Sequence, residues 1–269
     1  MNRATRRIAV GLEYDGTRYA GWQQQPGLAT IQDCLQRALS AVADHEVIVT
    51  GAGRTDAGVH AVAQVAHFDT TAERPLRGWV LGANSRLPAD IAVNWAVDAD
   101  AAFHARHAAL ARSYRYCILN RATRPALLRD RVCWLRAPLD AAAMHEAAQA
   151  LVGEHDFSSF RAIECQSATA MRRVDAISVR ADGPLVTVEV TANAFLHHMV
   201  RNIAGTLIEV GSGERGAGSV AATLAARDRT QAGITAPACG LYLWRVRYAD
   251  AFAFPEAPGI PPWAMITGA

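Results

Sequence analysis

The order of hydrophobic patterns in the first hundred residues constrains the fold of this 269-residue chain most strongly. Residues 7–14 (RIAVGLEY) alternate apolar and polar side chains and lead into Asp15-Gly16, which is typical of a half-buried strand followed by a turn. Thr30 is a candidate N-cap with apolar residues at helical spacing after it, so a helix is predicted at 30–43. Further strands are predicted at 46–50, 64–70 and 91–97, and a helix at 75–86. The resulting order, β-α-β-β-α-β, is that of ferredoxin-like folds.

A looser version of this pattern occupies the second half. Strands are predicted at 112–119, 132–135, 174–180, 185–191 and 241–248, and helices at 140–151, 196–210 and 219–227. We therefore predict an α+β protein of two ferredoxin-like (RRM-like) halves that share a mostly antiparallel central sheet, with helices on one face. The other face is expected to be open; ferredoxin-like RNA-binding domains form their RNA cleft on such a face, although many such folds bind no nucleic acid. The expected domains are 1–106, 107–250 and a Pro-rich tail at 251–269 that cannot form regular structure.

Two features of the sequence exclude classes of reaction mechanism and of cellular location. All 27 basic residues are arginine, which excludes any mechanism that needs a lysine Schiff base, a phosphate-loop lysine or a lysine nucleophile. No apolar run reaches the ~18 residues that a membrane span requires, and no signal-peptide core follows Met1. A cytoplasmic protein without membrane contact is expected.

A metal site is not expected either. The five cysteines are widely spaced and never form a C-x-x-C pair, which argues against a disulfide framework and against zinc. His197 and His198 are the remaining metal candidates, but neighbours on an extended strand point to opposite faces, and no carboxylate or cysteine lies at ligand spacing. We predict no metal and no cofactor.

The densest functional pattern is the segment 51–60 (GAGRTDAGVH), between two predicted strands. Its glycines let the backbone take positive φ or approach a ligand closely. Within it, Asp56 has the chemistry of a nucleophile or general base, and the nearby Arg54 would hold it ionised. The alternative is a loop aspartate that caps a turn.

A second pattern is the clustering of arginine. Eight arginines and one aspartate lie between Arg106 and Arg136, a local formal charge of +7 that the net charge of +2 hides. Tyr114, Tyr116 and Trp134 lie among them, and basic residues mixed with aromatics suit phosphate contacts and base stacking. The alternative is a solvated arginine face with at least one tyrosine in the core.

A third candidate is the segment 193–203 (NAFLHHMVRNI). Most of its apolar residues continue into a helix stripe, which explains the segment as core. Arg201 flanks this stripe, and a partly buried arginine needs an anionic partner, for which Asp56 is one possibility.

These residues resemble the TruA-type transfer-RNA pseudouridine synthases. The segment 52–61 (AGRTDAGVHA) is similar to the catalytic signature of that family. The family's other patterns follow in order at 14–23 (YDGTRYAGWQ), 103–106 (FHAR), 113–116 (SYRY), 156–161 (DFSSFR), 192–203 (ANAFLHHMVRNI) and 240–243 (GLYL). The resemblance covers nearly the whole chain, about residues 7–248, and leaves the Pro-rich tail unmatched.

The resemblance implies isomerisation of uridine to pseudouridine at positions 38, 39 and 40 of the tRNA anticodon stem-loop, with base flipping and without metal or cofactor. Asp56 falls on the family's aspartate nucleophile, Tyr114 on its substrate-ring tyrosine and Arg201 on the basic partner of the aspartate. Arg54 matches the arginine that takes the place of the flipped base, and Leu241 the aliphatic residue that packs on the uracil. A homodimer is also implied. The alternative function is a non-catalytic RNA-binding module, a tRNA chaperone that uses the same basic residues.

Overall fold

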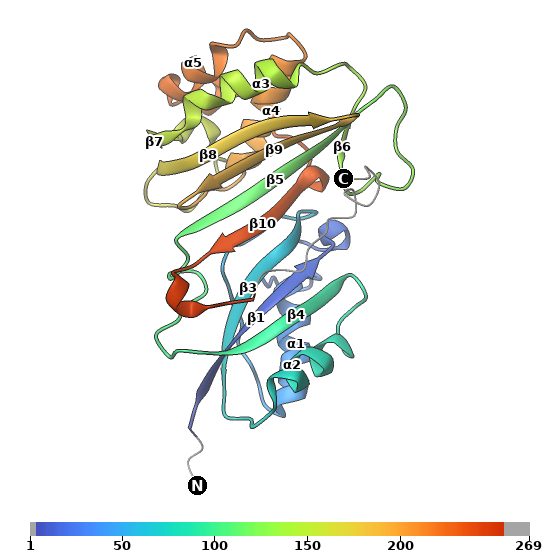
Figure 1. Cartoon of the computed structure of the whole chain (residues 1–269), viewed down its shortest axis with the longest axis vertical. Helices are drawn as coiled ribbons and strands as arrows, with labels where there is room; N and C mark the ends of the chain where they lie inside the picture. The colour runs from blue at the N-terminus through green and yellow to red at the C-terminus, as the bar shows by residue number, and fades with distance from the viewer. Residues whose placement is uncertain (1–3, 256–269) are drawn as a thin grey trace. The chain divides into compact units, whose positions relative to one another are not determined.

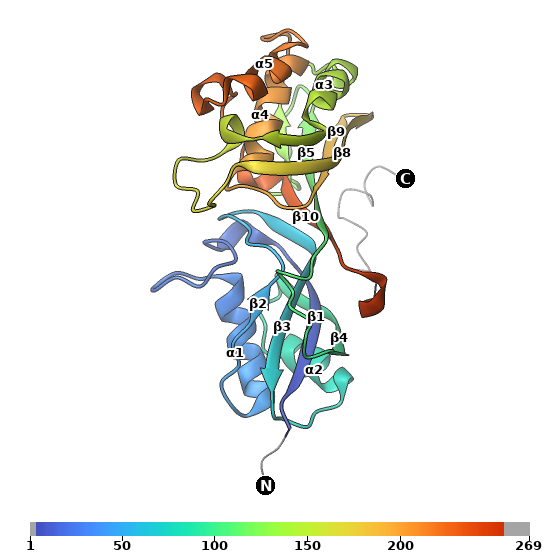
Figure 2. The same cartoon turned by 90° about the vertical axis from the view of Figure 1, so that its left-hand side faces the viewer.

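The computed structural model describes residues 4–255, drawn in colour in Figures 1 and 2. In this part of the chain it combines five α-helices with mostly antiparallel strands, in agreement with the predicted α+β class. The chain divides into two compact units. The first unit contains the residues up to Leu110 together with those from Leu243 onward, and the second contains Ala111–Tyr242. None of the helices in residues 4–255 is both long enough and apolar enough to cross a bilayer.

The first unit is built on the antiparallel strand order β4-β1-β3 (Figure 1), and β2 pairs with β3. Its elements are β1 (Arg6–Tyr14), α1 (Ile31–Ala43), β2 (Thr50–Gly51), β3 (His60–Thr70), α2 (Leu76–Asn84) and β4 (Ile91–Ala99). In the register, Val10 of β1 lies opposite Ala66 of β3 and Ala96 of β4. The order of elements is the predicted β-α-β-β-α-β.

Helices α1 and α2 cover one face of these strands. The Thr30 hydroxyl accepts a hydrogen bond from the Asp33 amide and caps α1 at the predicted residue. On α2, Trp79 is fully buried, and its ring meets that of Phe68 on β3 edge to face at 5.1 Å. Aromatic pairs in this geometry stabilise the contact beyond the burial of area alone.

Part of the opposite face of the first unit, which the prediction left open, is covered by aromatic side chains. Ala9 and Val65 lie on this face, buried in a cluster with Phe103 and with partly buried aromatics that follow β10, among them Phe252 and Phe254. Phe103 meets the Phe252 ring at 5.0 Å and the Phe254 ring at 4.8 Å. We call this group the C-terminal aromatic cluster. The first residues of the predicted tail are therefore part of the fold, whereas residues 256–269 lie outside the described range.

The strand predicted at 46–50 is reduced to the two residues of β2. Side chains of α1 bond the backbone that a strand would have paired. The Ser40 hydroxyl accepts from the Val47 amide, and Gln36 accepts from the Val49 amide. Gln32 donates to the Val49 carbonyl at 2.8 Å. Because these backbone groups are already bonded, the segment needs no partner strand.

The second unit has the antiparallel strand order β5-β9-β8-β7, with the short β6 parallel to β5. Its strands are β5 (Ala111–Asn120), β6 (Cys133–Leu135), β7 (Gly153–Asp156), β8 (Met171–Asp182) and β9 (Leu185–Ala192), and β10 (Leu241–Arg247) starts in this unit. Its helices are α3 (Ala141–Ala148), α4 (Met199–Gly211) and α5 (Ser219–Ala226). All three helices lie on one side of the strands (Figure 2). Strand β7 was not predicted, because its polar sequence, GEHD, has low strand propensity.

The two faces of this second sheet differ in polarity. Tyr114 of β5 lies opposite Val190 of β9, and both side chains are buried on the helix-covered face. The neighbouring pair, Arg115 and Glu189, points to the other face and forms an ion pair at 2.6 Å. The predicted arrangement had RNA contacts on the helix-free face. Tyr114 and Tyr116 share the helix-covered face of β5.

Candidate active site

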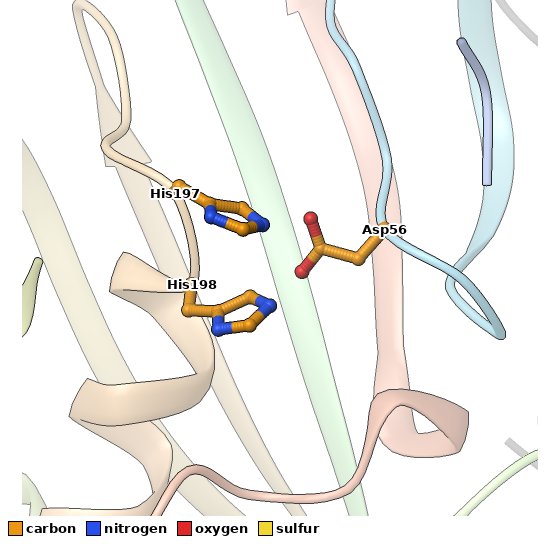
Figure 3. A group of neighbouring side chains, drawn as sticks. All are labelled: Asp56, His197 and His198. Carbon is orange, nitrogen blue, oxygen red and sulfur yellow. The ribbon is translucent and has the colours of Figure 1, made fainter. Parts of the chain in front are cut away.

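The loop between β2 and β3 carries Asp56 (Figure 3). Neighbouring strand residues bond the start of this loop. The Ala52 amide donates to the Val65 carbonyl at 2.7 Å. The fully buried Gln64 side chain donates to the Gly53 carbonyl at 2.7 Å and accepts from its amide at 3.3 Å. The loop therefore leaves the sheet in a fixed direction.

The turn around Asp56 is closed by backbone atoms. Gly58 has a φ of 75°, in the left-handed region that favours glycine. The Val59 amide donates to the Asp56 carbonyl at 3.1 Å. Thr55 is buried, Asp56 is partly exposed and Arg54 is exposed. Closure of this turn therefore uses the backbone carbonyl of Asp56.

A partly exposed carboxylate on a rigid loop suits nucleophilic or general-base chemistry. The backbone that carries this carboxylate is hydrogen-bonded before substrate arrives, which reduces the cost of ordering the loop during the reaction. Asp56 is the one predicted catalytic residue, and Arg54 lies on the same loop. The other predicted site residues, Tyr114, Arg201 and Leu241, belong to the second unit.

Tyr114 lies in the middle of β5 with only 8% of its surface exposed. Its ring meets the edge of the Phe195 ring, with centroids 5.0 Å apart and an interplanar angle of 82°. Tyr116, two residues further along the same face, is fully buried. The expectation that at least one of the two tyrosines belongs to the core is therefore correct for Tyr116.

The segment that leads into Leu241 is held from two elements. Arg201, in the first turn of α4, donates its Nε to the Ala236 carbonyl at 2.8 Å. The Tyr116 hydroxyl donates to the Pro237 carbonyl at 2.8 Å, and burial raises the pKa of this tyrosine far above its usual value, so it remains a neutral donor. These bonds fix the approach to β10, where Leu241 is buried at the first position.

His197 and His198 directly precede α4 (Figure 3). The expectation that they lie on an extended strand with rings on opposite faces is wrong. His198 has a φ of 60°, which turns the chain, and the two ring centroids are only 4.0 Å apart. The same turn delays the helix predicted from residue 196 until Met199. Structural zinc sites use four ligands, and within the described residues neither unit by itself brings three such side chains together.

The arginine-rich region, residues 106–136, contains arginines in ion pairs and further arginines with exposed side chains. Arg115 pairs with Glu189, and Arg129 donates to Asp130 at 2.8 Å. Four further arginines of the region have exposed side chains: Arg106, Arg121, Arg124 and Arg136. Trp134 is 37% exposed, and its indole N–H donates to the Arg121 carbonyl at 2.9 Å. The exposed part of this region therefore keeps both cations and an aromatic surface.

The sequence did not point to three buried polar side chains that lie beside the Asp56 loop or at its end. Tyr14, Gln64 and His60 are buried beside or at the end of the loop. Tyr14 and His60 lie inside two of the quoted motifs, and Gln64 interrupts an apolar strand. Such a polar residue in a core strand is the pattern that points to a buried hydrogen bond.

Comparison with known proteins gives a consistent result. A family model described as tRNA pseudouridine synthase matches residues 12–107 and 147–249. The tRNA pseudouridine synthase A of Methylococcus capsulatus is 56% identical over 246 residues, which cover 91% of each chain. That of Coxiella burnetii is 54% identical over 252 residues, or 94% of this chain and 97% of the relative. That of Pseudomonas aeruginosa is 53% identical over 251 residues, or 93% and 88% of the two chains.

Proposed function

The chain belongs to the tRNA pseudouridine synthase family, and we propose that it isomerises uridine to pseudouridine in tRNA with Asp56 as its nucleophile. The observation that carries the assignment of Asp56 is its position on a loop that is rigid and closed by backbone bonds while its side chain stays partly exposed. The family membership supports the reaction and the tRNA substrate. The position of Asp56 in the GRTDAG motif supports its role.

We propose positions 38, 39 and 40 of the anticodon stem-loop as the targets, on the strength of the sequence motifs. A uridine in a stem must leave its stack before the enzyme reaches it, at a cost of a few kcal/mol that protein contacts have to offset. In this proposal Arg54 takes the place of the flipped base. Tyr114 and Leu241 contact the uracil ring, and Arg201 is the cationic partner of Asp56.

The reaction itself is an internal rearrangement. The bond between N1 of uracil and C1′ of the ribose breaks, the base turns, and C5 bonds to C1′ while the C5 proton leaves and N1 gains one. Substrate and product are isomers, so no group enters or departs. A carboxylate that stabilises the detached state and a proton acceptor for C5 are sufficient, and Asp56 is proposed for the first of these roles.

We also propose that each half of the chain is ferredoxin-like, with a domain boundary near residue 106 and a Pro-rich tail from residue 251 whose first aromatic residues pack on the first half. The strand order β4-β1-β3 with β2 on β3 supports this for the first half. For the second half, the order β5-β9-β8 with helices α3 and α4 on one side supports it.

A homodimer in the cytoplasm, where tRNA is processed, completes the proposal. Sedimentation equilibrium tests the assembly: twice the mass of the chain is expected, and a monomer at micromolar concentration would contradict it.

The decisive experiment compares wild type with Asp56→Asn on unmodified tRNA. The substitution keeps the size of the side chain and removes the charge, so pseudouridine formation should fall below detection while tRNA binding persists. Asp98→Asn is the matched control, because Asp98 is an exposed partner of Arg6 in the same unit and should leave the rate unchanged. Site-resolved mapping of the product tests positions 38 to 40.

Conversion by Asp56→Asn at the wild-type rate would rule out Asp56 as nucleophile. The alternative of a non-catalytic tRNA chaperone predicts that even the wild type binds tRNA and converts nothing. The two results are therefore distinguishable in one assay.

A further inference from the structure

Residues 14–22 run from the last residue of β1 into the segment that precedes α1, and they contact the loop that carries Asp56. We call them the 14–22 clasp. Two backbone hydrogen bonds join the clasp to the loop: the Trp22 amide donates to the Thr55 carbonyl at 2.9 Å, and the Gly58 amide donates to the Tyr19 carbonyl at 3.3 Å. One attachment precedes the proposed nucleophile in sequence and the other follows it. The backbone that carries the nucleophile is therefore held on both sides.

Two glycines bring the clasp into direct contact with the loop backbone. A Cβ atom on Gly16 would lie 2.0 Å from the Val59 carbonyl oxygen. A Cβ on Gly21, whose φ is 90°, would lie 2.6 Å from the Thr55 carbonyl oxygen. Neither position has room for a side chain, because the two chain segments touch backbone to backbone.

A buried side-chain bond adds to these backbone contacts. The Tyr14 hydroxyl lies 2.8 Å from Oγ1 of Thr55 and also accepts a longer bond of 3.4 Å from Gln64. Tyr14 is only 4% exposed, and burial raises its pKa to about 12, so the hydroxyl keeps its proton at neutral pH. Thr55 is thus fixed through both its carbonyl and its hydroxyl, one residue before Asp56.

The far end of the loop is tied to the clasp by His60. Its Nδ1 lies 3.1 Å from Oδ1 of Asp15 and 3.0 Å from the Gly16 amide nitrogen. A protonated Nδ1 donates to the carboxylate, and an unprotonated Nδ1 accepts from the amide. Burial raises the pKa of Asp15, but hydrogen bonds from His60 and Thr17 outweigh that effect and hold it well below its usual value. Asp15 is therefore charged at neutral pH and available to His60.

We propose that Tyr14 is a positioning residue for Asp56, and that it acts through the Thr55 hydroxyl. This inference rests on the proposed role of Asp56. The bond from Tyr14 fixes the side chain of Thr55, and the two backbone attachments then leave the next residue little freedom. A displacement of about 1 Å at a reacting group lowers the rate by roughly 100-fold, so loss of the Tyr14 hydroxyl should lower kcat. Because Tyr14 is buried, the KM for tRNA should hardly change.

The test measures kcat and KM for tRNA in Tyr14→Phe, Thr55→Val, Thr55→Ser and the double variant Tyr14→Phe/Thr55→Val. We expect kcat to fall about 10- to 100-fold in Tyr14→Phe and in Thr55→Val, with KM within about twofold of wild type. Thr55→Ser keeps the hydroxyl and should therefore retain most of the wild-type kcat. The double variant should be no slower than the slower single variant, because both changes remove the same bond.

The matched control is Tyr248→Phe, which removes the hydroxyl of a partly buried hydrogen bond in the same unit. The Tyr248 hydroxyl donates to the Ala105 carbonyl at 2.7 Å, an acceptor outside residues 51–60. It should cost a similar amount of thermal stability and leave kcat unchanged. Hydrogen exchange gives a readout that does not depend on activity: the Trp22 and Gly58 amides should exchange faster in Tyr14→Phe than in Tyr248→Phe.

Three outcomes would each overturn the positioning role. Tyr14→Phe could keep the wild-type kcat, or it could change only KM. The rate losses of the two single variants could also multiply in the double variant. Unchanged exchange of both amides would overturn it even without an activity assay. An inactive wild type would refute the proposed function instead, and the exchange experiment would still decide the inference.

Discussion

At the scale of single residues, burial sets the charge state of polar groups in the first unit. His67 lies on the face of the C-terminal aromatic cluster, 6% exposed, with its ring edge-on to Phe103 at 5.9 Å. Its Nδ1 accepts from the Ala105 amide at 3.2 Å. Burial, with the nearby Arg7 and His104 charges, lowers the pKa of His67 to about 4. The neutral ring is therefore the form that the fold requires.

This pKa has a consequence for stability. The folded value of about 4 lies below the ordinary 6.5, so the unfolded state binds more protons between these values. The free energy of unfolding should be level above pH 6.5 and fall as the pH drops from 6.5 to 4. Urea unfolding across this range in wild type and in His67→Asn measures it, and the variant should show a shallower dependence. His107→Gln, at an exposed ring, is the control and should behave as wild type. A His67 resonance that titrates near 6.5 in NMR would refute the assignment.

At the scale of elements, side chains far away in sequence decide what a segment becomes. Residues 46–49 have strand-like sequence, yet Gln36, Ser40 and Gln32 of α1 bond their backbone in place of a partner strand. The segment after β10 shows the opposite case. Its prolines predicted only a segment without regular structure, yet Phe254 stacks on Trp95 with ring centroids 5.5 Å apart. Each outcome follows from a contact that no local pattern records.

Phe254→Ala tests the structural role of that segment. Loss of a large aromatic side chain from a partly buried site should lower the free energy of unfolding by about 1–3 kcal/mol. Chemical denaturation followed by tryptophan fluorescence measures the change, and Trp95 reports directly on the site. Ile163→Ala is the control, since Ile163 is 94% exposed and its truncation should change stability by less than about 0.5 kcal/mol. Equal stability of the two variants would show that the segment does not stabilise the sheet.

At the scale of the whole molecule, the distribution of charge matters more than its sum. The net charge is +2, but the arginine-rich region has exposed cations at Arg121, Arg124 and Arg136, whereas Arg115 is paired with Glu189. A polyanion responds to local cations, because each phosphate contact releases a condensed counterion. The exposed members should therefore dominate tRNA binding.

Replacement of Arg121 and Arg124 by glutamine should weaken tRNA binding and make its salt dependence shallower. If both contact phosphate, the slope of log affinity against log salt should fall by about 2. Fluorescence anisotropy with labelled tRNA at several salt concentrations measures it. Arg6→Gln, at an arginine paired with Asp98 outside the region, should leave the slope as in wild type. An unchanged slope in the double variant would show that tRNA does not contact this part of the region.

The sequence by itself determined the order and type of most elements, the cap at Thr30 and the GRTDAG loop that carries Asp56. These features depend on the spacing of apolar residues and on the backbone preferences of a few neighbours, which the sequence records directly. Only the tertiary structure decided that an aromatic cluster covers the first sheet, that His198 turns the chain before α4, and that Tyr14 bonds Thr55. Those features arise from contacts between residues distant in sequence, where close packing and the demand of buried polar groups for partners override local preference.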